Sequence, residues 1–63
     1  MKLIVLLFPS AEALVRFRLV ADPTVLEANL DTKILFSLCS NEQLELAEYV
    51  YDARVLEQQL SRN

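Results

Sequence analysis

The chain has 63 residues, no glycine, no histidine, one cysteine and a formal net charge of −3. One cysteine excludes an internal disulfide, the lack of histidine removes the commonest zinc ligand and general base, and the lack of glycine excludes phosphate-binding loops of the Walker or Rossmann type. These absences lead us to expect no metal, no cofactor and no enzymatic activity. The six basic residues are spread along the chain, so we also expect no nucleic-acid binding.

The first 13 residues allow two interpretations. A lysine, an apolar run and an Ala-x-Ala triplet ending at Ala13 outline a secretory signal peptide. The run Leu3–Phe8 is shorter than the roughly 7–15 apolar residues of such a signal, and far shorter than the roughly 20 of a membrane span. We favour a strand that is buried on both faces. The protein is therefore expected to be cytoplasmic, to keep this segment and to have no membrane partner.

Residues 11–22 are predicted to form a helix capped by Ser10. Apolar residues recur there at three- and four-residue spacing, namely Ala13, Leu14, Phe17, Val20 and Ala21. Residues 15–20 also alternate, so a strand remains the alternative. In the helix, Val15 and Leu19 lie among charges on the outer face and are candidate contact residues.

A β-hairpin is predicted after Asp22-Pro23, with its turn at Asp31-Thr32. The first arm alternates Leu26, Ala28 and Leu30 with polar residues, and the second alternates Ile34, Phe36 and Leu38 with Leu35, Ser37 and Cys39. Because the chain has no glycine, we expect an Asp, Thr or Lys to take any left-handed position in the turn.

The segment from Ser40 to Gln43 fits a capping box and predicts the start of a second helix. The residues expected to point inward are Leu44, Ala47, Val50 and Tyr51. The helix either ends near Asp52, followed by a last strand at residues 54–59, or runs on to about Ser61. We favour the strand.

The predicted order of elements is strand, helix, strand, strand, helix, strand. This is the plan of a small two-layer α+β sandwich of the ferredoxin-like βαββαβ type, formed as one domain by residues 1–63. The alternative is a four-stranded antiparallel meander followed by one long C-terminal helix. Such a plan is shared by proteins with many functions, so it predicts none by itself.

Two chemical features of the chain resemble functional sites. Cys39 precedes the second helix, and a helix N-terminus lowers the pKa of a thiol, so Cys39 is a candidate reactive thiol. The simpler interpretation is a small structural residue at the end of a strand. Glu45, Glu48 and Asp52 share one helix face and are expected to form a solvated acidic surface rather than a metal site.

Self-association is expected from the apolar content. A domain this small is marginally stable without a disulfide, a metal or a partner, and hydrophobic residues make up 54% of the chain. Because Leu3–Phe8 does not alternate, the strand sends large aliphatic residues to the open face of the sheet, either Ile4 and Leu6 or Leu3, Val5 and Leu7. The predicted interface residues are Ile4, Leu6, Leu35, Val15 and Leu19, with Glu27, Asn29, Glu57 and Gln59 toward the sheet edges.

The expected function is therefore that of a non-enzymatic interaction or assembly module. Its expected partner is itself, as a homodimer or a higher even-numbered oligomer, with another protein as a further candidate. The alternative is a small-ligand or sulfur-handling protein that uses Cys39 or a pocket between subunits.

Overall fold

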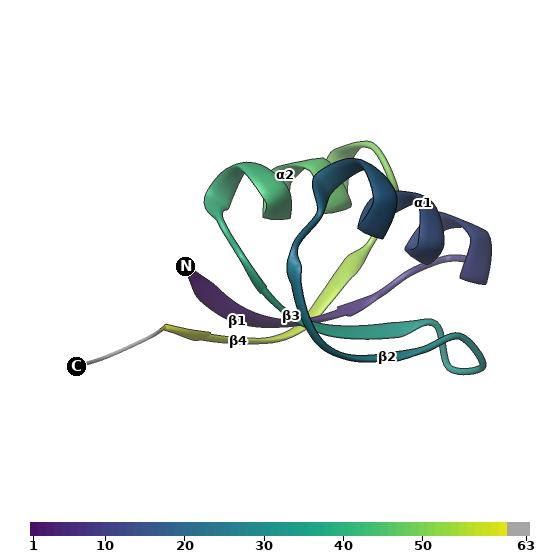
Figure 1. The fold of residues 1–63 in the computed structure, drawn as a ribbon, viewed down its shortest axis with the longest axis horizontal. Coiled ribbons are helices and arrows are strands. Elements are labelled where there is room, and N and C mark those ends of the chain that lie inside the picture. The colour runs from purple at the N-terminus through teal and green to yellow at the C-terminus, as the bar shows by residue number, and fades with distance from the viewer. Residues whose placement is uncertain (61–63) are drawn as a thin grey trace.

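A computed structural model of the chain describes residues 1–60. The elements are β1 (Lys2–Leu7), α1 (Ala11–Ala21), β2 (Thr24–Asn29), β3 (Ile34–Cys39), α2 (Asn41–Tyr49) and β4 (Arg54–Leu60). Figure 1 shows both helices on one face of a four-stranded sheet, whose other face carries no helix. The α+β class and the helix predicted at residues 11–22 are confirmed. The last segment is a strand, so the meander with a long C-terminal helix is wrong.

The strands lie in the order β2-β3-β1-β4, and each neighbouring pair is antiparallel. The βαββαβ order matches a ferredoxin-like arrangement. The first strand of the chain is thus one of the two central strands, which explains its continuous apolar sequence. Within residues 1–60, the helices are too short and too polar to cross a membrane.

Helix α1 begins at Ser10, whose Oγ accepts a hydrogen bond from the Ala13 backbone N–H at 3.1 Å. It ends at Asp22, which has a left-handed backbone and is followed by a proline. Leu14 and Phe17 are buried against the sheet, as predicted. Val20 is exposed, contrary to the prediction. The centre of the apolar stripe of α1 packs on the sheet, and Val20 lies at the margin of that stripe.

Helix α2 begins with the predicted capping box. Ser40 Oγ accepts from the Gln43 backbone N–H at 3.1 Å, and Gln43 Oε1 accepts from the Ser40 backbone N–H at 2.8 Å. Ala47 is buried, and Leu44 and Tyr51 pack against the core as predicted. Val50 is exposed instead of inward-pointing, because the helix ends one residue earlier.

The β2–β3 turn is closed by Asn29, whose Oδ1 accepts hydrogen bonds from the backbone N–H groups of Asp31 and Thr32 at 2.9 and 3.1 Å. Lys33 has a φ of 63°. A lysine therefore takes the left-handed position of the turn, in agreement with the expectation. A side chain with a Cβ pays a steric penalty in that region, which glycine would avoid.

The core lies between the two helices and the sheet, and it corrects part of the predicted interface. Ile4, Leu6 and Leu35 are fully buried beneath the helices, so their assignment to an interface is wrong. Leu6 lies opposite Leu35 on adjacent strands, so both residues face the same side of the sheet. The residues that share this core are Phe8, Leu14, Phe17, Cys39, Ala47 and Ala53.

Candidate interaction surface

The face of the sheet turned away from the helices carries a block of large apolar side chains. We call this side of the sheet the open face (Figure 1). On its two central strands, three cross-strand pairs follow one another, namely Leu3 with Leu38, Val5 with Phe36, and Leu7 with Ile34. All six side chains are half-buried by their neighbours alone. Of the two alternatives predicted for β1, the open face therefore carries Leu3, Val5 and Leu7 rather than Ile4 and Leu6.

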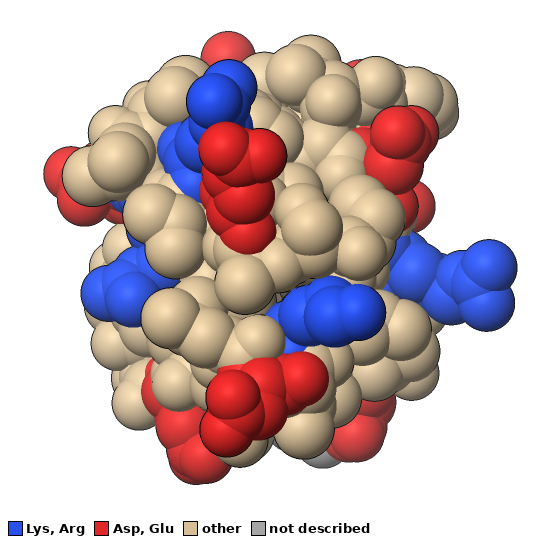
Figure 2. Space-filling view, turned by 90° about the vertical axis from the view of Figure 1, so that its right-hand side faces the viewer, with Lys and Arg blue, Asp and Glu red and all other residues tan. Residues whose placement is uncertain are grey.

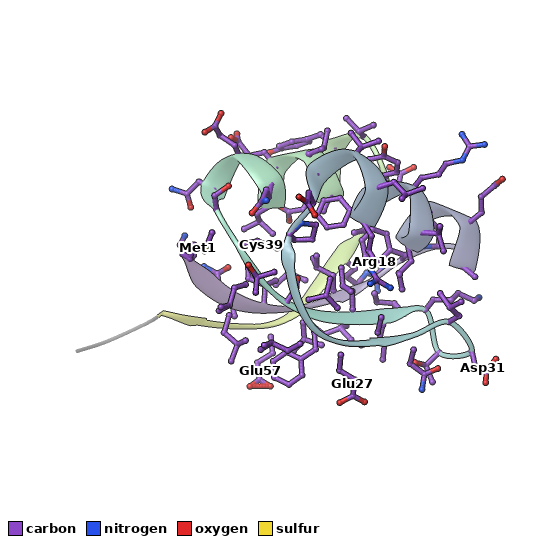
Figure 3. All side chains as sticks on the ribbon, viewed as in Figure 1. Met1, Arg18, Glu27, Asp31, Cys39 and Glu57 are labelled. Atoms are coloured by element: carbon purple, nitrogen blue, oxygen red, sulfur yellow. The ribbon has the colours of Figure 1, made fainter. Side chains whose placement is uncertain are left out.

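Polar residues border this apolar block on both edge strands. Glu27 of β2 lies opposite Phe36, and Glu57 of β4 lies opposite Val5. Figure 3 shows that both glutamate side chains project from the open face. The next row is bordered by Asn29 and Arg54. Glu27, Asn29 and Glu57 thus lie on the edge strands as expected, whereas the side chain of Gln59 lies outside the described part of the structure.

A shallow hollow of about 200 Å³ lies on the open face beside Phe36. Its lining residues are Val5, Glu27, Asn29, Thr32, Ile34 and Phe36. Pockets that enclose small molecules usually measure about 300–1,000 Å³ and bury most of the ligand. The size of this hollow suits a side chain of a packed partner better than a bound metabolite.

Val15 and Leu19, the other predicted interface residues, lie on α1 and are exposed. They line a separate groove of about 310 Å³ next to the start of β2, together with Arg18, Asp22, Pro23 and Val25. Figure 3 shows Arg18 between α1 and the sheet, away from the two glutamates of the open face. The structure therefore separates Val15 and Leu19 from the apolar block of the sheet.

Cys39 lies at the end of β3 with its side chain in the core. Its Sγ is 3.2 Å from Ser37 Oγ, and the two groups share a hydrogen bond. Burial raises the pKa of the Cys39 thiol above its ordinary value of 9.0, and the hydrogen bond with Ser37 opposes part of this rise. The pKa is thus raised, not lowered as a reactive thiol would require, and Cys39 fits the simpler interpretation of a structural residue at the end of a strand. A buried thiol with a raised pKa is a poor nucleophile.

Charged side chains do not gather into a region of one sign at the end of the molecule seen in Figure 2, where acidic and basic residues are interspersed. An exposed ion pair on α1 joins Arg16 to Glu12 at 3.4 Å. Among the described residues, no group of acidic residues or cysteine is arranged to hold a metal ion. The apolar block is therefore the feature of this surface that most needs a functional explanation.

The β3 residues Ile34, Phe36 and Leu38 were missed as surface residues in the sequence. The alternation of ILFSLC separates these residues from Leu35, Ser37 and Cys39, but Leu35 was predicted to be the side chain that faces the partner. The chain matches no known protein family, no curated protein and no solved structure.

Proposed function

We propose that this protein is a non-enzymatic interaction module of the cytoplasm that associates with a second copy of itself through the open face. The observation that carries the proposal is the run of three adjacent apolar pairs, centred on Val5 and Phe36, on a face that no element within residues 1–60 covers. A cytoplasmic location is supported by β1, because the segment that resembles a signal peptide supplies Ile4 and Leu6 to the core.

The energy available from this face is large for so small a protein. A domain of 63 residues is expected to be stable by roughly 3–9 kcal/mol. Full burial of a large aliphatic side chain contributes roughly 1.5–3 kcal/mol, and the six side chains are already partly buried. If completing the burial of each adds about 0.5 kcal/mol, the open face contributes about 3 kcal/mol per copy. Association would therefore stabilise the fold substantially.

A second copy is the partner that this arrangement suits best. Two sheets pack face to face about 10 Å apart, with their interdigitating side chains between them. In a two-fold pair, the central row formed by Phe36 and Val5 would pack against the same row of the other copy. The glutamates at both ends of the row would stay near solvent, which gives an apolar centre and a polar rim.

The size of the face predicts the strength of the association. Four strands spaced about 4.8 Å apart, with six residues of about 3.3 Å each, give a footprint of roughly 400 Å² per copy. Stable interfaces usually bury about 800 Å² per partner. We therefore expect a weak, reversible dimer rather than a permanent one, with a dissociation constant between about 100 µM and about 1 mM.

The first test is the mass of the protein as a function of concentration. Sedimentation equilibrium from about 1 µM to about 1 mM should show a reversible change from the 7.2 kDa chain mass to twice that value. A protein that stays monomeric and folded over this range would overturn the proposal.

The second test is Phe36→Lys. Its new ammonium group would lie opposite Glu27 on the neighbouring strand, so it is expected to support the folded monomer. In the dimer, two lysines would meet at the centre of an apolar interface, so this variant should remain monomeric and folded by circular dichroism.

The matched control is Leu19→Lys, which makes the same change in charge at a side chain of α1 that is 78% exposed. This variant should dimerise like the wild type. Dissociation by Leu19→Lys, with Phe36→Lys still dimeric, would place the interface on α1 and contradict the proposal.

A further inference from the structure

Each edge strand of the sheet carries a β-bulge. Both bulges lie level with the central pair formed by Phe36 and Val5. The register between β2 and β3 shifts between Val25 and Glu27, so Leu26 is the extra residue. The register between β1 and β4 shifts so that Val5 pairs with Glu57 while the next residue of β1 pairs with Val55. Leu56 is therefore the extra residue of the second bulge. Both bulges flank the central Phe36–Val5 pair, one at each edge of the sheet.

The extra residue of both bulges is an exposed leucine. Leu26 is 57% and Leu56 is 48% exposed. In each strand the preceding valine packs against the core. A bulge interrupts the alternation of side chains, so its two residues that oppose one partner can face the same side of the sheet. Neither leucine packs against the core, unlike the valine before it, which places each leucine beside its glutamate on the open face. Figure 3 shows the next residue of each strand, Glu27 or Glu57, projecting from that same face.

We propose that Leu26 and Leu56 form the outer parts of the self-association surface, so that a second copy packs across the full width of the sheet. This inference rests on the proposed function. The six apolar side chains of β1 and β3 cover only the two central strands, and the two leucines extend the apolar row to both edges. Each bulge thereby places apolar surface on the open face where regular alternation would leave only a glutamate.

The placement of the bulges also selects a second copy as the partner. Both edges present a leucine beside a glutamate at the same row. A stacked copy related by a two-fold axis therefore brings leucine against leucine, whether β2 lies over β2 or over β4 of the other copy. The glutamates beside the leucines lie at the solvent border in both arrangements.

The same bulges oppose the other way in which sheets associate. An extra unpaired residue interrupts the ladder of backbone hydrogen bonds and twists the edge, which discourages the addition of a strand from another molecule. Face-to-face packing of two copies is thus a closed assembly. The inference predicts a dimer that stops growing, not a continuous sheet.

Leu26→Thr and Leu56→Thr test this inference, since threonine keeps the strand preference and removes most of the apolar surface. We expect each substitution to raise the dimer dissociation constant by about tenfold or more, because every dimer contains two copies of the changed side chain. The double variant should raise it further. Urea unfolding at concentrations where the wild type is monomeric should change little, because both leucines are exposed in the monomer.

Leu19→Thr is the matched control and should leave the dissociation constant unchanged. If the wild type dimerises and Phe36→Lys does not, while Leu26→Thr and Leu56→Thr both bind like the wild type, the inference is wrong and the proposed function stands. A monomeric wild type would overturn both. Species that keep growing beyond the dimer with concentration would also overturn the inference, because they would indicate pairing through the edges.

Discussion

The side chain of Gln43 joins the start of α2 to the end of α1. Its Nε2 donates a hydrogen bond to the carbonyl oxygen of Ala21 at 2.9 Å, while its Oε1 accepts from the backbone N–H of Ser40 at 2.8 Å. The carbonyl of Ala21 belongs to the last turn of α1, where carbonyl groups have no partner within the helix. One amide group thus completes the cap of one helix and satisfies the end of the other.

Gln43→Ala should therefore cost more than the loss of the capping box alone. We expect the free energy of unfolding to fall by about 2–3 kcal/mol for Gln43→Ala and by about 1 kcal/mol for Ser40→Ala. Urea unfolding measures both variants under the same conditions. Equal losses would show that the hydrogen bond to Ala21 does not contribute.

Lys33→Gly should stabilise the hairpin. Lys33 has a φ of 63°, a region that glycine occupies without the steric cost of a Cβ, and its carbonyl oxygen would still accept the hydrogen bond from the Phe8 backbone N–H. We expect a gain of about 0.5–1 kcal/mol in urea unfolding. Thr32→Gly is the control, since Thr32 is not among the positive-φ residues, and it should bring no gain.

Cys39 should make the protein less stable in alkaline solution. Burial raises the pKa of this thiol in the folded protein above its ordinary value of 9.0. Below pH 9 both states keep the proton, whereas above it the unfolded chain loses the proton first, so unfolding becomes more favourable as the pH rises through the folded-state pKa. Urea unfolding from about pH 8 to about pH 10.5 should show this loss.

The control for that measurement is Cys39→Ala, which removes the thiol and should show a smaller alkaline loss than the wild type. A thiol reagent gives an independent check. Cys39 should react slowly in the folded protein and at the rate of a free thiol in urea, because its side chain lies in the core. Rapid labelling of the folded protein would contradict the buried position and restore the sulfur-handling alternative.

Removal of residues 1–13 should abolish folding. The deletion takes out β1, which pairs with both β3 and β4, and with it Ile4, Leu6 and Phe8 of the core. Circular dichroism of residues 14–63 should show no cooperative unfolding transition. A stable fold formed by residues 14–63 would instead support the signal-peptide interpretation.

Leu35 and Phe36 are neighbours in the chain whose substitution should have opposite consequences. Leu35→Lys would bury an unpaired charge in the core, at a cost comparable with the whole stability of the domain, and should give an unfolded chain. Phe36→Lys lies on the open face and should give a folded monomer. Circular dichroism of the two variants separates these outcomes. A folded Leu35→Lys variant would contradict the assignment of the two faces.

Local signals in the sequence were sufficient for the starts of the two helices, but not for the last strand, which the overall plan of the fold favoured over a longer helix. The capping box at Ser40 and Gln43 and the cap at Ser10 fixed where both helices begin, because side-chain oxygens there meet backbone N–H groups a few residues away. The left-handed turn residue was also restricted by composition, since a chain without glycine must use another residue at Lys33. These features depend on contacts between residues close in sequence, which a sequence displays directly.

The two faces of the sheet, in contrast, were decided by the tertiary structure. Leu35 was predicted to face outward, yet it lies in the interior together with Ser37, whose hydroxyl shares a hydrogen bond with Cys39. β1 could not correct this error, because both of its sides are apolar. Only the packing of the helices shows which side is covered, and so which apolar residues remain for a partner. The bulges at Leu26 and Leu56 likewise arise from pairing with other strands, which no local pattern specifies.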